Sequence, residues 1–351
     1  MAETGTPLAV IHSVAPIRIC DNGCWTDTWF AGHGRVFNIA VQPGAEVRIA
    51  VFKARSDAAR VVLHAENFGP PYEVRHAAPP WGPHPLLEAA IASMPTPPDV
   101  RLEVRIHSEA PPGAGTGTSA AVIVALIGAL DALTPGRLTQ GEVAMAAHRV
   151  ETVMLGRQAG VQDQIASAHG GINFIEITEY PNAVVTPVRP PTAVMDALQQ
   201  RLALVYLGKS HDSSAIHESV IRSLETAGPN SAAIVELRGA ARRSRAALLA
   251  GDFEGLGRAM TASTEAQARL HESLVSDDAR RVCEIAKRHG VLGWKVNGAG
   301  GDGGSLTLLG DGRRSAMDDL VREIDQVSPA FRLIPITLDL EGLRVWRGES
   351  E

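Results

Sequence analysis

The chain has few cysteines, no long hydrophobic run and no excess of positive charge. Its three cysteines, Cys20, Cys24 and Cys283, are too few for a disulfide scaffold and contain no CxxC pair. The net charge of −6 argues against binding to nucleic acid or to a membrane surface. The longest apolar run, residues 120–130, is shorter than the ~18 residues of a membrane-spanning helix. No Lys or Arg precedes Arg18, so the sequence predicts no basic secretory signal, and we expect a cytoplasmic protein without nucleic-acid or membrane partners.

Several catalytic motifs are also missing. The only Gly-Lys-Ser, at 208–210, lacks the first glycine of a Walker loop, because position 203 is Ala. No serine lies in a GxSxG context, and neither His217-Glu218 nor His271-Glu272 has a second histidine at zincin spacing. We therefore expect neither serine-hydrolase nor zinc-protease chemistry.

The residue pattern changes from strands to helices along the chain. Two runs of β-forming residues, 35–41 and 46–51, flank Gln42-Pro43-Gly44-Ala45, which is typical of a hairpin-like break. Residues 118–133 are rich in Ala and apolar on nearly all sides, which predicts a buried helix. Since strand runs precede helical runs, the sequence favours an α+β fold.

A proline-rich stretch divides the chain. Four prolines fall between positions 181 and 191, and a strand pattern begins shortly after them. We predict an N-terminal domain over residues 1–190 and a C-terminal domain over residues 191–351.

The first of two glycine-rich segments reads PPGAGTGTSAA from Pro111 to Ala121. It joins an alternating strand to the buried helix, where backbone N–H groups and the helix dipole favour an anion. Glycine permits the positive φ angles and the close approach of phosphate oxygens. A flexible turn that only caps the helix is the alternative. Candidate phosphate-binding residues are Pro111, Gly113, Ala114, Gly115, Thr116, Gly117, Thr118 and Ser119.

The second glycine-rich segment reads KVNGAGGDGG from Lys295 to Gly304. It formally satisfies GxGxxG, but a strand pattern follows it where the dinucleotide fingerprint requires a helix. We interpret the segment as a backbone platform that lies against a ligand or against the first glycine-rich segment. Its candidate substrate contacts are Gly298, Gly300 and Gly301.

Two carboxylates lie between the glycine segments. A helix that begins with a capping box at Thr139 and Glu142 places Glu151 at the border of its apolar stripe, and Asp163 starts another helix. Taken alone, these residues are better explained as a salt bridge and an N-cap. Beside a phosphate loop, however, two carboxylates and a hydroxyl are the groups needed to hold Mg²⁺ and a phosphoryl acceptor.

These segments resemble the motifs of the GHMP kinases, named for galactokinase, homoserine kinase, mevalonate kinase and phosphomevalonate kinase. The family's P-x-G-x-G-L-G-S-S-A-A loop corresponds to residues 111–121, and its K-x-x-G-A-G-G-G-G element to residues 295–303, with Asp302 replacing one glycine. A family motif of Glu followed by Gly and Asp corresponds to Glu151 and Asp163. The resemblance spans almost the whole chain. It implies an N-terminal domain of the ribosomal S5 domain 2 type and a ferredoxin-like C-terminal domain, with ATP and substrate between them.

Within the family the chain is most similar to sugar kinases of the D-glycero-D-manno-heptose 7-phosphate kinase type. Residues 16–19, 35–40 and 170–176 carry this similarity. The pair Thr26-Asp27 also resembles the sugar-binding Asp of galactokinases. Heptokinase-like proteins usually have a glycine cluster before this pair, whereas this chain has Trp25. The Trp25 ring would either narrow the sugar pocket or supply a stacking face.

The resemblance implies an ATP- and Mg²⁺-dependent kinase that phosphorylates a sugar or sugar phosphate, such as a heptose 7-phosphate, at its anomeric hydroxyl. Ser119 and Glu151 would hold Mg²⁺, and Asp163 would orient or deprotonate the acceptor. A kinase for a non-sugar alcohol and a non-catalytic ligand-binding relative are the alternatives, and a homodimer is compatible with the sequence. The candidate substrate-binding residues are Arg18, Trp25, Thr26, Asp27, Lys209, Gly298, Gly300 and Gly301.

Overall fold

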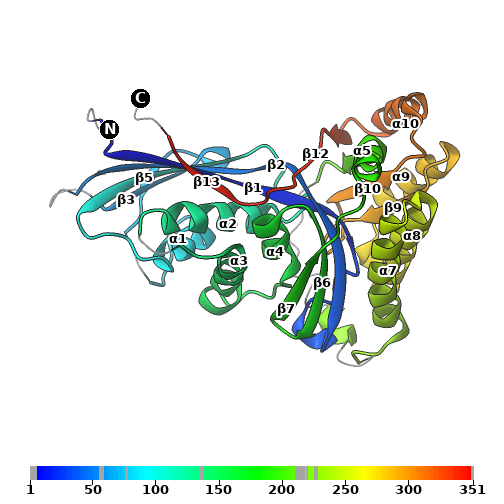
Figure 1. The fold of residues 1–351 in the computed structure, drawn as a ribbon, viewed down its shortest axis with the longest axis horizontal. Helices are drawn as coiled ribbons and strands as arrows, with labels where there is room; N and C mark the ends of the chain where they lie inside the picture. The colour runs from blue at the N-terminus through cyan, green and yellow to red at the C-terminus, as the bar shows by residue number, and fades with distance from the viewer. Residues whose placement is uncertain are drawn as a thin grey trace.

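Two long antiparallel strands, β1 (Ala9–Asn22) and β2 (Gly34–Lys53), carry the first of two sheets. The sheet has the order β13-β1-β2-β5-β3-β4, and β6 and β12 also pair with β2 (Figure 1). Its other strands are β3 (Val61–Ala65), β4 (Tyr72–Glu73), β5 (Val100–Ser108), β6 (Ile172–Glu179), β7 (Asn182–Pro187), β12 (Thr337–Leu338) and β13 (Arg344–Gly348). The structure, a computed structural model, describes residues 6–54, 59–75, 78–134, 137–209, 218, 220–224 and 228–348.

Strand β2 is continuous where the sequence predicted a break. The prediction of a hairpin-like break at residues 42–45 is wrong, because β2 runs through these residues. Residues 34–39 of β2 pair with β6, and residues 45–53 pair with β5. Pro43 has no N–H to donate, and it lies between these two ladders, opposite a register shift in β1. A proline at this position therefore leaves the strand intact.

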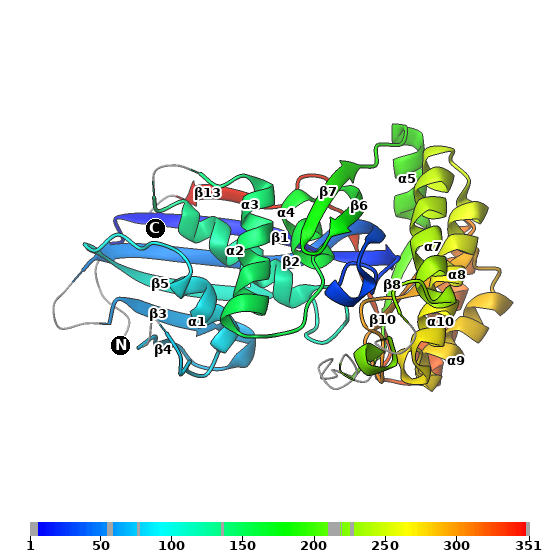
Figure 2. The same cartoon turned by 90° about the horizontal axis from the view of Figure 1, so that it is seen from below.

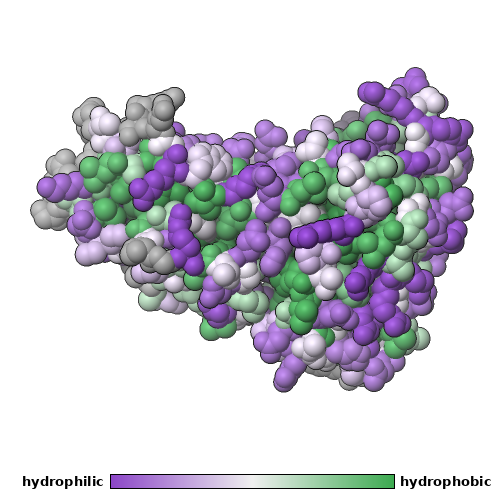
Figure 3. Space-filling view, in the orientation of Figure 1, coloured by the Kyte–Doolittle hydropathy of each residue, from purple (hydrophilic) through white to green (hydrophobic). Residues whose placement is uncertain are grey.

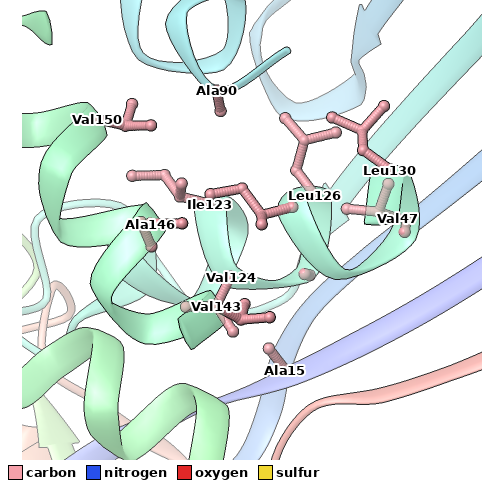
Figure 4. Packing of buried hydrophobic residues seen from close by; sticks show 14 of the residues in the cluster. Ala15, Val47, Ala90, Ile123, Val124, Leu126, Leu130, Val143, Ala146 and Val150 are labelled. Atoms are coloured by element: carbon pink, nitrogen blue, oxygen red, sulfur yellow. The ribbon is translucent and has the colours of Figure 1, made fainter. Parts of the chain in front are cut away.

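Helices cover one face of the first sheet (Figures 1 and 2). The central helix is α2 (Thr118–Asp131), and its side chains Ile123 and Leu126 are fully buried, as the apolar sequence predicted. Figure 4 shows α2 among Ala90, Val143 and Val150, which come from three neighbouring elements. The elements around it are α1 (Pro85–Ala92), α3 (Gln140–Arg149), a π-helical turn (Val150–Met154) and α4 (Gln162–His169).

The second sheet has the strand order β11-β8-β10-β9 and lies at the other end of the molecule, beside a layer of helices (Figure 1). Its strands are β8 (Leu202–Tyr206), β9 (Gly293–Val296), β10 (Ser305–Leu309) and β11 (Arg332–Ile334). The helices of this part are α5 (Thr192–Arg201), α7 (Ala232–Leu249), α8 (Phe253–Leu270), α9 (Asp277–Arg288) and α10 (Arg314–Val327). Short 3-10 turns span Trp29–Ala31, Glu66–Phe68 and Glu272–Leu274.

The end of the chain returns to the first sheet. Strand β13 pairs with β1, so that Gly348 lies opposite Val10, and β12 pairs with β2. The predicted division between residues 190 and 191 falls just before α5 and stays a prediction. The α+β fold is confirmed.

The surface mixes polar and apolar side chains. On the face drawn in Figure 3, hydrophobic side chains emerge in separate groups between hydrophilic ones. Within the described part of the chain, none of the helices has the length and apolar character needed to cross a membrane.

Candidate active site

A cleft of about 920 Å³ brings together all the predicted motifs. Its walls come from the end of β1 and the turn after it, the predicted phosphate loop, the loop that leads into α4, and the second glycine-rich segment. The volume lies at the upper end of the ~300–1,000 Å³ typical of ligand pockets. It is large enough for a nucleotide together with a small acceptor.

The predicted phosphate loop lines this cleft through residues 112–119, whereas Pro111 lies outside the lining. Gly113, Gly115 and Gly117 have φ angles of 71°, 70° and 72°, a left-handed conformation that glycine adopts readily. Gly117 is the N-cap of α2, and no side chain caps the helix. The first N–H groups of α2 have no partner inside the helix, so this helix start is suited to an anion.

The two glycine-rich segments contact each other. A Cβ on Gly115 would lie 2.7 Å from the carbonyl oxygen of Asn297, and one on Gly298 would lie 2.7 Å from that of Gly115. The Ser305 hydroxyl at the start of β10 donates to the carbonyl of Ala114 at 2.6 Å. The second segment therefore lies against the first, which was one of the two predicted possibilities.

Only part of the second segment reaches the cleft. Gly298 lines it, but Gly300 and Gly301 do not belong to the lining. The N–H of Gly301 donates to the carbonyl of Leu274 at 3.1 Å, and a Cβ on Gly300 would lie 1.9 Å from that same oxygen. The structure thus places Gly300 and Gly301 in a backbone support behind Gly298.

Arg18 connects β1 to the phosphate loop and to α4. Its Nε donates to Asp163 Oδ1 at 2.9 Å, and its Nη1 donates to the carbonyl of Gly115. The backbone N–H of Arg18 also donates to the carbonyl of Thr116 at 2.9 Å. Asp163 in turn lies beside the start of α2, since a Cβ on Gly117 would be 3.2 Å from its carboxyl carbon. Arg18 therefore holds the Asp163 carboxylate next to the phosphate loop.

A buried ion pair joins the two halves of the site. Asp21 Oδ1 at the end of β1 lies 3.2 Å from Lys295 Nζ on β9, and neither side chain is exposed. Asp21 Oδ2 accepts a hydrogen bond from the N–H of Gly298 at 2.9 Å and lies 3.6 Å from an Arg18 nitrogen. Lys295 also donates to Gln267 at 2.8 Å. One buried carboxylate thus contacts two cations and the second glycine-rich segment.

Asp27 lines the cleft. Its Oδ2 accepts a hydrogen bond from the N–H of Gln162 at 3.1 Å, and a Cβ on Gly160 would lie 2.0 Å from this oxygen. Burial and the nearby negative charge of Asp163 raise the pKa of Asp27 to about 6. Ionised Asp27 is therefore a strong hydrogen-bond acceptor that favours donors from a ligand.

Glu151 lies in the π-helical turn that follows α3, which begins at the predicted capping box. Its side chain is buried, lines the cleft, and accepts a hydrogen bond from Nε2 of Gln164. Burial, followed by the charge of Asp163, raises the pKa of Glu151 to about 7. No ion pair within 4 Å is found for Glu151 among the described residues, so the salt bridge considered as the alternative role of this residue is not formed there.

Of the other predicted substrate-binding residues, only some line the cleft. Trp25 is buried, lines the cleft and has a φ angle of 73°. The hydroxyl of Thr26 donates to the carbonyl of Gly23 at 2.7 Å, and Thr26 is not part of the lining. Lys209 is half exposed, forms ion pairs with Asp278 and Asp302 at 3.3 and 3.0 Å, and also lies outside the lining.

Sequence reasoning overlooked several polar residues of this site. Asp21 was not singled out, and Lys295 was noted only as the start of a glycine motif. A carboxylate directly after Ile19 and Cys20 in a strand pattern was an available signal, because unpaired charge is costly at a buried strand end. Gln162 and Gln164, on either side of Asp163, also line the cleft, and no signal in the sequence singles them out.

Comparisons with known proteins agree with this geometry. The family model described as the GHMP kinases N terminal domain matches residues 86–171, and the model of the GHMP kinases C terminal domain matches residues 244–316. The first range contains the phosphate loop, Glu151 and Asp163, and the second contains Lys295 with its glycines. The chain thus carries both domains of the GHMP kinases. It is therefore a kinase, and GHMP kinases use ATP as phosphate donor.

Individual GHMP kinases resemble the chain along most of its length. D-glycero-alpha-D-manno-heptose 7-phosphate kinase of Campylobacter jejuni is 26% identical over 252 residues, which are 70% of this chain and 71% of that protein. The structure of Lactococcus lactis galactokinase complexed with galactose has a TM-score of 0.75 at 16% identity and covers 95% of both chains. A D-glycero-D-manno-heptose 1-phosphate kinase from Bacteroides thetaiotaomicron has a TM-score of 0.72 at 20% identity and covers 97% of this chain and all of its own. These structures show that the GHMP kinase fold is shared.

We expect Lys295→Met to lower the free energy of unfolding by about 3–5 kcal/mol, because the change leaves the buried Asp21 carboxylate without its nearest cation. Urea denaturation followed by circular dichroism measures the effect. Lys209→Met is the matched control, since Lys209 also pairs with aspartates but is half exposed. Equal stability of the two variants would contradict the role given to the Asp21–Lys295 pair.

We expect Glu151→Gln to stabilise the metal-free kinase at about pH 8, by up to about 3 kcal/mol. A carboxyl group whose pKa is raised from 4.5 to about 7 stabilises the fold below pH 4.5, and this contribution is lost as the pH rises through 7. The neutral amide avoids that loss, so the difference from wild type should nearly vanish at about pH 5. Urea denaturation in EDTA at both pH values measures the free energies of unfolding of the two proteins. A difference between them that does not change with pH would refute the raised pKa of Glu151.

Proposed function

We propose that this GHMP kinase transfers the γ-phosphoryl group of ATP, with Mg²⁺, to the anomeric hydroxyl of a sugar or sugar phosphate. The observation that carries the proposal is the position of Asp163. Its carboxylate faces the cleft beside the start of α2 and is held there by Arg18. Its negative charge contributes to the raised pKa values of both Asp27 and Glu151. An acceptor bound at Asp163 would thus lie next to the phosphate loop.

The cleft fits a nucleoside triphosphate. The uncapped start of α2 and the backbone of residues 113–119 supply donors for phosphate oxygens. Elsewhere in the cleft, the exposed ring of Phe68 lies 6.0 Å from that of His84, and both residues belong to the lining. Aromatic faces of this kind suit a nucleobase. We therefore assign the phosphates to the loop and the base to the region of Phe68 and His84.

The residues near the phosphate loop also fit a magnesium ion. Glu151 is a buried carboxylate without an ion-pair partner in the described part of the chain, and the Ser119 side chain lies in the cleft lining at the start of α2. Oxygen ligands of this type suit Mg²⁺, which usually retains several waters. When bound, the ion would neutralise charge on the transferred phosphoryl group. Glu151 and Ser119 are its proposed protein ligands.

The acceptor would be positioned by three charged groups. Asp163 accepts the proton of the attacking hydroxyl as the new oxygen–phosphorus bond forms and the bond to the β-phosphate oxygen breaks. Arg18 holds Asp163 in place, and Asp27 accepts hydrogen bonds from other hydroxyls of the acceptor. In this arrangement phosphoryl transfer depends chiefly on positioning and charge neutralisation.

The choice of a sugar is supported by the similarity to a heptose 7-phosphate kinase and by Asp27. Trp25 adds a ring to the same wall of the cleft, which suits the apolar face of a sugar. A non-sugar alcohol as acceptor is the second candidate, favoured by the buried Trp25 where heptokinase-like proteins have glycines. Asp163, Glu151 and Ser119 together support catalysis over a purely binding role.

Asp163→Asn should lower kcat by a factor of about 10²–10⁴, because the amide cannot accept the hydroxyl proton. Affinity for ATP should stay close to the wild-type value, since the phosphate loop is unaltered. Steady-state assay and calorimetric titration of nucleotide measure the two quantities. An unchanged kcat would remove Asp163 from the proposed mechanism.

The acceptor class can be tested with a panel of hexoses, heptose 7-phosphates and homoserine. We expect turnover with sugars or sugar phosphates, and a phosphorus NMR signal that couples to the anomeric proton of the product. Glu151→Ala serves as the inactive control. Turnover of homoserine alone would support the non-sugar alternative, and ATP binding without turnover of any acceptor would support a binding protein.

A further inference from the structure

Two buried glutamines flank Asp163 in the first turn of α4. Gln162 and Gln164 are 4% and 1% exposed, and both line the cleft. In each, the side-chain Oε1 is buried and has no hydrogen-bond partner within the described part of the chain. A buried polar atom left in this state costs about 1–3 kcal/mol. Such atoms beside a catalytic carboxylate indicate that a ligand completes their hydrogen bonding.

The contacts of Gln164 determine which way its amide points. Its Nε2 donates to Oε2 of Glu151. The ionised carboxylate, the form that binds a cation, can only accept hydrogen bonds, so in that form the NH₂ end of Gln164 faces Glu151 and the Oε1 end faces away from it. The amide therefore fixes one oxygen of Glu151 and presents an oxygen of its own.

Gln162 differs from Gln164 in what it contacts. Its backbone N–H donates to Asp27 at 3.1 Å, on the acceptor side, and among the described residues it forms no hydrogen bond with Glu151. Residues two apart on a helix point to different sides. The two glutamines thus share burial and helix position but serve different carboxylates.

We propose that Gln164 is a positioning residue of the metal site: it orients the Glu151 carboxylate toward a divalent cation and directs its own Oε1 to that ion's hydration shell. The inference rests on the proposed function, in which Glu151 binds the magnesium ion. Groups that orient a metal ligand usually change metal affinity by about 10–100-fold when they are removed. A cation such as Mg²⁺, which prefers oxygen and keeps its waters, suits both oxygens.

The test compares the affinity of the non-hydrolysable analogue AMP-PNP with Mg²⁺ and with EDTA, by calorimetric titration of the full chain. In wild type, Mg²⁺ should strengthen binding. In Gln164→Met, which keeps the side-chain size but removes both polar ends, that strengthening should fall by a factor of about 10–100. Affinity in EDTA should not change. Binding of Mn²⁺ in the presence of AMP-PNP, followed by electron paramagnetic resonance, should weaken in parallel.

Gln162→Met is the matched control, because it removes an equally buried amide from the same turn without touching Glu151. Its Mg²⁺ effect on AMP-PNP binding should equal that of wild type. Gln164→Asn provides a second variant should Gln164→Met not fold, since its amide is one carbon shorter and no longer reaches Glu151. It should show the same loss.

Each other outcome overturns the inference in a distinguishable way. If Gln164→Met and Gln164→Asn keep the wild-type Mg²⁺ effect, Gln164 does not position the metal ligand, and the proposed function stands. If they weaken AMP-PNP equally with Mg²⁺ and with EDTA, the role of Gln164 is general packing. If wild type itself shows no Mg²⁺ effect, the magnesium site of the proposed function fails together with the inference.

Discussion

The site depends on one buried carboxylate, Asp21, which lies between two cations. Burying a single charge is costly unless it is paired and hydrogen-bonded. Asp21 meets this requirement with Lys295 from the second sheet, Arg18 from its own strand, and the N–H of Gly298. Because these partners come from opposite ends of the sequence, the carboxylate is satisfied only when the two parts of the molecule are together. The Asp21 contacts with Lys295 and Gly298 therefore help to hold the second glycine-rich segment against the first.

Through Arg18, the Asp21 carboxylate also affects the position of Asp163. Arg18, held by Asp21, contacts Asp163 and the carbonyl of Gly115, so the position of the Asp163 carboxylate is tied to that of the glycine-rich loop before α2. Around Asp163, the carboxylates of Asp27 and Glu151 are buried, and burial together with the charge of Asp163 raises the pKa of each. We expect this burial of carboxylates to lower the stability of the metal-free protein, as is common where a functional site holds groups with shifted pKa values.

Much of the fold could be predicted from local sequence. The capping box of α3, the buried helix α2 and the glycine-rich loop with positive φ angles before it depend on neighbouring residues, and the structure has all three. The break at residues 42–45 was predicted because a proline normally ends a strand. This prediction is wrong, because β2 changes its pairing partner near Pro43 and local sequence carries no sign of that change. The contact that Glu151 does make, a hydrogen bond from Gln164 on a different helix, also could not be read from local sequence.

The sequence alone determined the family, because three motifs in a fixed order are specific even without coordinates. It also determined where glycine permits the backbone of the phosphate loop to take positive φ angles. Only the tertiary structure decided which charges are buried and with which partners they pair. The contact between Asp21 and Lys295 joins residues 274 positions apart, and its strength comes from the exclusion of water on both sides. No local pattern encodes that exclusion, since it arises when the two sheets and their glycine-rich segments pack together.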